Sequence, residues 1–543
     1  MIRPLTIGVL LAAGSLFALS LDEIARKPEG HVRNFQLWEY LQQEQVSPAE
    51  AERAFTLFDG VNYKLYMAYA ARSGDPDVKE TARCWSLGGS QLVTEPSDDC
   101  VRMALSPGRV AGLSQESKTA LYRRFDQTPD APWLKAMSEL TPESDVTKLD
   151  PKLFVKIALS AGSSYRHDIL DRDYPAAFVR ELSGANGFDR LVKLVVTDDG
   201  MGRFQRALLA VEPNRVASQC AFFLALNQLR YGHEEATLRL LQRAYDTFYY
   251  RMDKDKSLFW QYLVTEKPQL LRLLAQSVDI NIYSLYANEL LERRVDNYFI
   301  TLNVSPRKKP DVDITDPFEW EGLVDAIRGT PKEELFDLAR RYRSEPMLPV
   351  QAFILERAYG YKMHSYIAPY GDAMYGMKSD KRAMMLSLMR QESRFIPSAL
   401  SRSYALGLMQ MMPFLVKAMD KEQEVPTGSL EKMFDPQTNI AYASRHLDYL
   451  EKYLYHPLLI AYAYNGGIGF TKRYLLDGAF EKSSYEPFWS MEMMANSESR
   501  EYGKKVLANY IVYKRIFGER VSIGRLFDNQ KHPSRSDRFR ASR

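Results

Sequence analysis

The stretch that decides the fold is Asp380-Lys-Arg-Ala-Met-Met-Leu-Ser-Leu-Met-Arg-Gln-Glu-Ser-Arg394, because its apolar residues recur at the spacing of an amphipathic helix. One face of that helix carries Met385, Leu388, Met389 and Glu392. Glu392 therefore continues an apolar stripe, where the loss of water disfavours the carboxylate and raises its pKa. A general acid that works near neutral pH needs such a carboxyl. The alternative is a glutamate at a fraying helix end, since Pro397 follows closely.

Three segments further along the chain combine apolar helical patterns with polar side chains. The first, Gly407-Leu-Met-Gln-Met-Met-Pro413, holds one amide, that of Gln410, which can both donate to and accept from a sugar. Alternatively, this segment is a packing motif at a helix start. The second, Ala463-Tyr-Asn-Gly-Gly467, ends an apolar helix at glycine and can direct its Tyr and Asn into a cleft. The third places one helical face along Glu498, Tyr502, Val506, Tyr510, Tyr513 and Phe517, which points Glu498 inward.

The chain ahead of this region is predicted to be mainly α-helical. Val46-Ser-Pro-Ala-Glu50 has the N-cap, early proline and glutamate of a capping box, and Asp150-Pro151 opens another helix. Glu235 to Tyr250 has its apolar residues on one face. Tyr298 to Val304 and Leu191 to Thr197 are the best candidates for strands. Many short amphipathic helices without a fixed sequence period predict a stacked superhelix.

Composition and the N-terminal sequence predict an exported, soluble protein of several domains. The 543 residues carry a net charge of only +3, which argues against a dedicated nucleic-acid binder. Arg3, the apolar run Leu5 to Leu19 and the small residues beside it have the pattern of a cleaved export signal, with an uncleaved membrane anchor as the alternative. No later segment has the length of apolar sequence that a membrane span needs.

The C-terminal end, Lys531 to Arg543, is rich in basic residues. We interpret it as a frayed, solvated tail, or alternatively as a weak attachment to anionic cell-wall polymer or to a membrane surface.

The three cysteines suit an oxidising compartment. Cys84 and Cys100 enclose a short polar stretch, which favours a disulfide between them. Cys220 lies in an apolar run and is predicted to be a buried thiol. The seven histidines show no metal-ligand spacing, so neither a metal nor another cofactor is expected.

The order and spacing of three motifs resemble the catalytic domain of the soluble lytic transglycosylases, a lysozyme-like fold related to goose-type lysozyme. These motifs are Arg390-Gln-Glu-Ser393, Gly407-Leu-Met-Gln-Met-Met-Pro413 and Ala463-Tyr-Asn-Gly-Gly467. The helical region ahead of them resembles that family's superhelical U domain and small helical L domain in architecture. The ranges we assign are 1–20 for the signal peptide, 21–310 for the U domain, 311–375 for the L domain, 376–525 for the catalytic domain and 526–543 for the basic tail.

The resemblance implies that Glu392 is the sole catalytic acid and base. The residues expected to bind substrate are Ser401, Met409, Gln410, Met412, Tyr464, Asn465 and Glu498. The chain departs from the family pattern at Tyr404, where Gly is usual, and at Gly467, where Ala is common.

The implied reaction cleaves the β-1,4 bond between N-acetylmuramic acid and N-acetylglucosamine without water and leaves a 1,6-anhydromuramic end. The expected partners are peptidoglycan glycan strands and possible cell-wall enzymes, with no nucleic acid and no stable membrane span, and the expected location is the periplasm. Two alternatives stay open: a hydrolytic muramidase of the same fold, and a scaffold that binds peptidoglycan without cleaving it.

Overall fold

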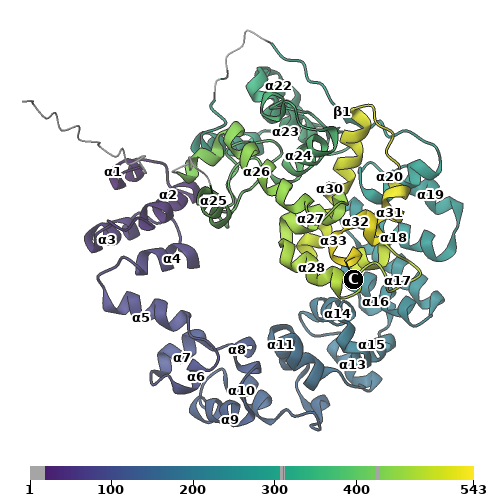
Figure 1. The fold of residues 1–543 in the computed structure, drawn as a ribbon. Coiled ribbons are helices and arrows are strands. Elements are labelled where there is room, and N and C mark those ends of the chain that lie inside the picture. Colours follow the sequence, from purple (N-terminus) through teal and green to yellow (C-terminus); the bar gives the residue numbers. More distant parts are fainter. Residues whose placement is uncertain (1–18, 306–309, 311, 423–428, 543) are drawn as a thin grey trace, which may run out of the picture. The chain divides into compact units, whose positions relative to one another are not determined.

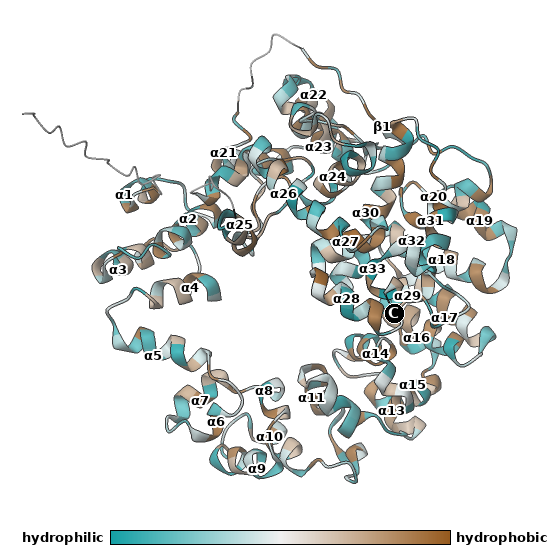
Figure 2. Ribbon diagram, in the orientation of Figure 1, coloured by the Kyte–Doolittle hydropathy of each residue, from teal (hydrophilic) through white to brown (hydrophobic). Residues whose placement is uncertain are grey.

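The computed structural model describes residues 19–305, 310, 312–422 and 429–542 (Figure 1). Helices form almost all the regular structure of these ranges, which confirms the prediction of a mainly α fold. Hydrophobic and hydrophilic residues alternate along most of the helices, as Figure 2 shows. Such alternation is expected of short amphipathic helices that each bury one stripe. The predicted signal peptide lies outside the described residues except for its last two positions.

The chain divides into two compact units, and each is described by itself. The first unit contains Met1–Ala82, Asp311–Arg328 and Ile396–Tyr442. The second contains Arg83–Pro310, Gly329–Phe395 and Ala443–Arg543. The domain boundaries expected from the sequence stay a prediction.

The first unit is built from N-terminal helices and two later segments of the chain. Its helices are α1 (Leu21–Ala25), α2 (His31–Leu41), α3 (Pro48–Thr56), α4 (Tyr63–Ala70), most of α5 (Pro76–Trp85), α21 (Pro317–Gly329), α25 (Pro413–Asp420) and the start of α26 (Pro436–Glu451). Ser47 and Glu50 form the predicted capping box at the start of α3. Leu37, Leu41 and Leu65 lie in the core that α2, α3 and α4 share.

Tyr404 is the centre of an aromatic cluster in the first unit. Its ring is fully buried and lies 5.4 Å from His31, 5.4 Å from Phe35 and 5.3 Å from Trp38, between ring centroids. Its hydroxyl accepts a hydrogen bond of 3.1 Å from the Asn62 amide. Tyr404 also has a φ of 62°, the left-handed conformation that glycine adopts without strain. This explains why glycine suits the position, and why tyrosine requires the packing of α2 to be tolerated there.

The second unit contains the other helices, of which α16, α17 and α18 pack on their neighbours in sequence, whereas α24 and α27 both pack on the distant α30. The helices up to residue 290 are α6 (Gln91–Thr94), α7 (Asp98–Ala104), α8 (Pro107–Ala111), α9 (Gln115–Arg124), α10 (Ala131–Glu139), α11 (Pro151–Ser160), α12 (Ser163–Tyr165), α13 (Ala176–Leu182), α14 (Phe188–Val196), α15 (Gly202–Ala207), α16 (Ser218–Arg230), α17 (Glu234–Thr247), α18 (Arg251–Thr265), α19 (Pro268–Leu274) and α20 (Ile282–Leu290). The later ones are α22 (Leu335–Arg341), α23 (Leu348–Ala358), α24 (Ser379–Glu392), α27 (Pro457–Gly466), α28 (Ile468–Leu476), α29 (Phe488–Met493), α30 (Ser497–Ile516), α31 (Ile523–Gln530), α32 (Pro533–Ser536) and α33 (Arg538–Ala541).

Only one of the two predicted strands forms. Strand β1 (Tyr298–Phe299) pairs in parallel with β2 (His364–Ser365). The prediction of a strand at Leu191 to Thr197 was wrong, because residues up to Val196 belong to α14. The run is rich in β-branched residues, but its buried side chains also follow helical spacing, and packing on α11 and α16 stabilises the helix.

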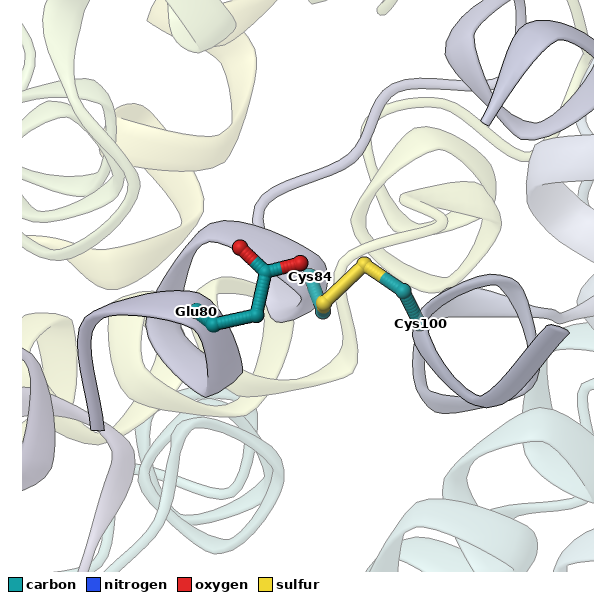
Figure 3. Close-up of side chains that lie close together, drawn as sticks. All are labelled: Glu80, Cys84 and Cys100. Atoms are coloured by element: carbon teal, nitrogen blue, oxygen red, sulfur yellow. A yellow bond between two sulfur atoms is a disulfide. The ribbon is translucent and has the colours of Figure 1, made fainter. Parts of the chain in front are cut away.

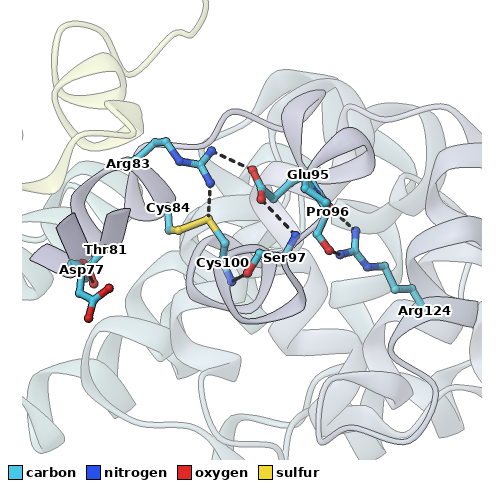
Figure 4. The surroundings of a disulfide bond; sticks show 9 residues. All are labelled: Asp77, Thr81, Arg83, Cys84, Glu95, Pro96, Ser97, Cys100 and Arg124. Carbon is cyan, nitrogen blue, oxygen red and sulfur yellow. Dashed lines mark hydrogen bonds and ion pairs between the residues drawn. A yellow bond between two sulfur atoms is a disulfide. The ribbon is translucent and has the colours of Figure 1, made fainter. Parts of the chain in front are cut away.

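Cys84 and Cys100 form a disulfide between α5 and α7, with Cα atoms 4.9 Å apart. Figure 3 shows this bond together with Glu80, four residues before Cys84 on α5. Because both sulfurs are in the disulfide, neither is a thiolate that could bind a metal ion. Arg83 pairs with Glu95 at 2.8 Å and donates to Cys100 Sγ at 3.3 Å (Figure 4). The third cysteine, Cys220, is buried in α16, as predicted.

The basic C-terminal end is folded rather than frayed over its described residues, so that interpretation was wrong. Arg540 is 5% exposed. Its guanidinium donates to Asp537 Oδ2 at 2.9 Å and to the carbonyls of Ala479 and Gln530. A buried cation with these acceptors holds α33 against the rest of the second unit. None of the helices in the described ranges is long and apolar enough to cross a membrane.

The left-handed backbone of Tyr404 predicts that glycine at this position is less destabilising than alanine, although glycine is the smaller residue. Tyr404→Ala removes a buried ring and keeps the strain, so it should lower the free energy of unfolding by about 3–5 kcal/mol. Tyr404→Gly removes more atoms but relieves the strain, so it should be more stable than the Ala variant by about 1 kcal/mol.

Urea denaturation of the wild type, Tyr404→Ala and Tyr404→Gly measures the three free energies of unfolding. Phe414→Ala is a matched control, because Phe414 lies in the same unit with 70% of its surface exposed, and its loss should change stability by less than about 0.5 kcal/mol. An Ala variant as stable as the Gly variant would contradict the account of Tyr404.

Candidate active site

Helix α24 ends at Glu392, and the backbone after it turns away sharply. Residues 383–389 of α24 are buried, as the apolar stripe predicts. Arg394 and Phe395 both have left-handed φ values, 54° and 66°, so the helix cannot continue. Two non-glycine residues in this conformation store strain that neighbouring contacts must offset.

Glu356 of α23 supplies those contacts. Its side chain is buried and accepts hydrogen bonds from Arg390 at 3.2 Å, from the Ser365 backbone N–H at 2.7 Å, and from Arg394. One carboxylate therefore joins the last turn of α24 to the first left-handed residue. Charge-assisted hydrogen bonds of this kind are roughly twice as strong as neutral ones. Glu356 fixes where α24 stops, and with it the position of Glu392.

The Glu392 carboxyl is partly buried, and one side chain of the described residues donates a hydrogen bond to it. Tyr502 Oη of α30 donates to Glu392 Oε1 at 2.6 Å. Burial raises the pKa of Glu392 to about 7, the hydrogen bond from Tyr502 lowers that pKa, and the negative charge of Glu498 raises it. Near neutral pH the carboxyl is therefore divided between its acid and its base form.

Helices α27 and α30 bring Tyr464, Asn465 and Glu498 to the region of Glu392. Asn465 at the end of α27 donates to Glu498 Oε1 at 3.2 Å and accepts from Ser499 Oγ at 2.7 Å. These two bonds fix the orientation of the amide. Burial and the charge of Glu392 raise the pKa of Tyr464 well above its usual value, so Tyr464 is a neutral hydroxyl beside the carboxyl.

Close packing of α27 on α30 depends on glycine. A Cβ atom on Gly503 would lie 2.2 Å from the Tyr462 ring, and one on Gly466 would lie 2.6 Å from Ser499 Oγ. Larger residues at either position would separate the helices and displace Asn465 from Glu498. At the end of α27, Gly467 has a φ of 86°, a conformation that glycine adopts without the strain that a side chain would bring.

The remaining predicted binding residues lie in the first unit, in the loop from 399 to 412. Ser401 Oγ accepts from the Ala405 N–H at 2.9 Å, and the Gln410 amide donates to the carbonyls of Ala399 and Gly407 at 2.9 and 3.0 Å. Met409 is fully buried, whereas Met412 is partly exposed and caps α25. Ser401 and Gln410 shape the loop, and their contact with substrate, like that of Met409 and Met412, stays a prediction.

The loop is held by a buried side chain that sequence reasoning missed, Asn439 of α26. Its amide donates to the carbonyls of Leu406 and Met433, and its oxygen accepts from the Met409 N–H at 2.9 Å. Gly407 is required beside it, because a Cβ there would lie 2.1 Å from the Met433 carbonyl oxygen.

Two further residues were missed at Glu392 itself. Tyr502 shares the predicted inward face with Glu498, and that face was the available signal for its role. Glu356 had no local signal, because its partners lie 9 to 38 residues away in sequence.

The arrangement provides one proton donor and acceptor with a fixed orientation. Because Tyr502 occupies Oε1, the acidic proton of Glu392 belongs on Oε2. Asn465, Tyr464 and Glu498 add polar groups of fixed position around it. Such a site suits general acid–base chemistry on a polar substrate.

Part of the chain is similar to a known family of proteins. Residues 372–485 match the family model described as the transglycosylase SLT domain. A soluble lytic murein transglycosylase from Escherichia coli is 28% identical over 220 residues, which are 39% of this chain and 33% of that protein. A putative soluble lytic murein transglycosylase from Haemophilus influenzae is 28% identical over 199 residues, 36% of this chain and 33% of that protein. The aligned region thus spans about a third of the length of these curated relatives.

Among solved structures, an inactive variant of the lytic transglycosylase Slt from Pseudomonas aeruginosa has a TM-score of 0.50 at 15% identity and covers 91% of this chain and 80% of its own. This likeness concerns the fold alone. Glu392, Tyr464 and Asn465 all lie within residues 372–485, the part of the chain that matches the transglycosylase SLT domain.

Proposed function

We propose that the protein is a peptidoglycan lytic transglycosylase that uses Glu392 as its single catalytic acid and base. The observation that carries this proposal is a partly buried carboxyl with a pKa of about 7, held by Tyr502, in a domain that matches the transglycosylase SLT family. A carboxyl with this pKa has an acid form to donate and a base form to accept at neutral pH.

The first step is protonation of the leaving group. Glu392 gives its proton to the glycosidic oxygen between N-acetylmuramic acid and N-acetylglucosamine, and the bond from that oxygen to the anomeric carbon breaks. The oxygen of the 2-acetamido group of the muramic acid stabilises the positive charge that develops on this carbon. The Tyr502 hydroxyl stabilises the new Glu392 carboxylate through its hydrogen bond.

The second step closes a ring and restores the acid. The Glu392 carboxylate removes the proton from the 6-hydroxyl of the same muramic acid, and the oxygen attacks the anomeric carbon. The products are a 1,6-anhydromuramic end and a released chain that begins with N-acetylglucosamine. No water is consumed, and the proton that Glu392 gave in the first step returns to it.

One carboxyl is enough for this route, whereas most glycosidases use two. The second carboxylate near Glu392, that of Glu498, accepts from Asn465 and raises the pKa of Glu392, so its assigned role is electrostatic and positional. A muramidase of the same fold would need water in place of the 6-hydroxyl, and product analysis separates the two reactions.

The location and the division of labour are part of the proposal. An export signal at residues 1–20 would deliver the enzyme to the periplasm, where the substrate is found. The helical region ahead of residue 310 would hold long glycan strands while the SLT domain cleaves them, and other cell-wall enzymes are possible partners.

Glu392→Gln should leave the fold intact and abolish cleavage. Glutamine can still accept from Tyr502, but it cannot transfer a proton, and general acid–base catalysis contributes about 10²–10⁴-fold. Digestion of purified peptidoglycan, followed by chromatography of soluble fragments, measures the loss. Glu345→Gln is the control, because Glu345 is exposed. Activity of Glu392→Gln within tenfold of the wild type would refute the role of Glu392.

The pH profile should have an alkaline limb near pH 7, because the acid form of Glu392 is needed to start the reaction and burial raises its pKa to about 7. Above that pH, kcat/KM should fall about tenfold per unit. Tyr502→Phe removes a hydrogen bond that lowers the pKa, so the limb should move to higher pH.

Tyr510→Phe is the matched control for that shift, since Tyr510 lies on the same helix but donates to Asp380. The limb of this variant should stay in place. A Tyr502→Phe limb at lower pH, or an equal shift in both variants, would contradict the assignment.

Digestion in heavy-oxygen water should place no label at the new chain ends, because the 6-hydroxyl attacks within the same sugar. Intramolecular attack benefits from effective molarities that reach about 10⁵–10⁸ M, far above the concentration of water. Mass spectrometry should find each fragment one water lighter than a muramidase product. Stoichiometric label at the new ends would establish hydrolysis and replace this proposal with the muramidase.

A further inference from the structure

A cavity of about 670 Å³ lies at the start of α24, at the opposite end of this helix from Glu392. Its walls come from the segment before α24, the first turns of α24, the end of α26, the start of α27 and one residue of α30. All of the lining residues belong to the second unit. An α-helix rises about 1.5 Å per residue, so the lining residues Asp380 to Met384 lie roughly 12–18 Å from Glu392 along the helix axis. The cavity is therefore separate from the site around Glu392, and its volume is typical of sites for small ligands.

Three tyrosines line this cavity, which we call the tyrosine pocket after them: Tyr375, Tyr455 and Tyr510. Tyr375 is 93% exposed and Tyr455 is 50% exposed. A tyrosine ring is a flat apolar surface with a polar tip. The ring packs on the C–H face of a sugar, while the hydroxyl forms hydrogen bonds with sugar oxygens. The pocket thus has two accessible aromatic surfaces that suit a carbohydrate.

The buried part of the pocket lining is apolar. Met384, Leu454 and Ile460 line the pocket and are 2%, 0% and 5% exposed. A plain hexose presents mainly hydroxyl groups, which gain nothing from such a surface. An N-acetylated sugar adds a methyl group, and the burial of that methyl against apolar side chains is favourable. The lining therefore favours an N-acetylated sugar over a plain one.

The charges around the tyrosine pocket are balanced. The charged lining residues are Lys378, Lys381, Asp380, Asp448 and Glu451. Lys381 Nζ lies 2.6 Å from Asp448 Oδ1, and Lys514 Nζ lies 2.5 Å from Asp380 Oδ1. With Lys514 included, three cations face three carboxylates. Because neither sign is in excess, the pocket suits a neutral ligand better than a cation or an anion.

The Glu451 carboxyl offers acceptor oxygens for such a ligand. It forms no ion pair and accepts no hydrogen bond within the described ranges of the chain. Burial raises the pKa of Glu451, the charge of Lys381 lowers it, and the charge of Asp448 raises it. An uncharged donor would satisfy this carboxyl without disturbing the charge balance. A sugar hydroxyl or an acetamido N–H is a donor of this kind.

We propose that the tyrosine pocket is a second glycan-binding site, which holds N-acetylated sugars of the polymer without cleaving them. This inference rests on the proposed function, because peptidoglycan strands consist of N-acetylated sugars. Tyr375 and Tyr455 stack on the sugar rings, Glu451 accepts from them, and the apolar lining covers an acetyl methyl group. Binding here raises the effective concentration of the polymer at Glu392. Linked binding of this kind can exceed either single affinity by about 10²–10⁴-fold.

Calorimetry tests the site directly, with a hexamer of N-acetylglucosamine as the probe and a hexamer of glucose as the comparison. Each is titrated into the full chain carrying Glu392→Gln, with and without the pair Tyr375→Ala/Glu451→Gln. This pair should preserve the fold, because Tyr375 is almost fully exposed and glutamine is nearly isosteric with glutamate. The pair should weaken one binding site for the N-acetylglucosamine hexamer by about 10-fold or more. The glucose hexamer should not bind at that site.

Tyr249→Ala/Glu345→Gln is the matched control, because both residues are exposed and lie outside the pocket. It should leave the binding of the N-acetylglucosamine hexamer unchanged. Equal binding of this hexamer with and without the pocket pair would overturn the site. Equal binding of the two hexamers at the site would overturn its preference for N-acetylated sugars.

Kinetics test the role of the site on the polymer. The wild type, the pocket pair and the control pair, all with Glu392 intact, are compared on intact sacculi and on short soluble glycan fragments. The pocket pair should raise KM for sacculi by about 10-fold and change KM for fragments less than twofold, because a short fragment cannot reach both sites. An equal rise on both substrates, or no rise on sacculi, would overturn this role. Absence of cleavage by the wild type on both substrates would instead overturn the proposed function, and calorimetry would still decide whether the pocket binds glycan.

Discussion

The position of one carboxyl at the end of α24 is the constraint on which the rest of the site depends. Glu392 has to be removed from water to hold a proton near neutral pH, and it has to stay accessible to a substrate. A helix terminus meets both needs, because the helix buries the preceding turn while the chain leaves in another direction. The partial negative charge at the C-terminal end of α24 acts in the same sense as burial and Glu498, and disfavours the carboxylate.

The end of α24 after Glu392 is stabilised by Glu356, a residue of another helix. Arg394 and Phe395 take left-handed conformations at a cost of about 1–3 kcal/mol each, and the buried Glu356 offsets this by binding Arg390 and Arg394 together. Removing Glu356 alone would leave two guanidinium groups without their shared partner, which is more costly than the loss of a single hydrogen bond. A residue of α23 thus determines the position of Glu392, the proposed catalytic group, through contacts with the residues around the end of α24.

Features that depend on residues close together in the sequence could be predicted, whereas features that depend on distant residues could not. The apolar stripe of α24 and the motif that ends at Gly467 are local patterns, so Glu392, Tyr464 and Asn465 could be proposed as site residues from the sequence. The mainly α architecture also follows from local periodicity. Glu356 could not be assigned, because nothing near it in sequence indicates that its partners are two arginines of another helix. Leu191 to Thr197 shows the reverse error, where β-branched residues suggested a strand and tertiary packing selected a helix.

Tyr404 shows how a departure from a family pattern is understood once its backbone is known. Sequence comparison alone says that a large ring replaces the usual glycine beside the predicted sugar-binding Ser401. The φ of 62° lies in the left-handed region that favours glycine, and the ring packs against His31, Phe35 and Trp38 of α2. His31 Nε2 also lies 2.8 Å from the Ser401 carbonyl oxygen, so α2 contacts the loop at two points. The path of the loop therefore depends on an N-terminal helix more than 350 residues away in sequence.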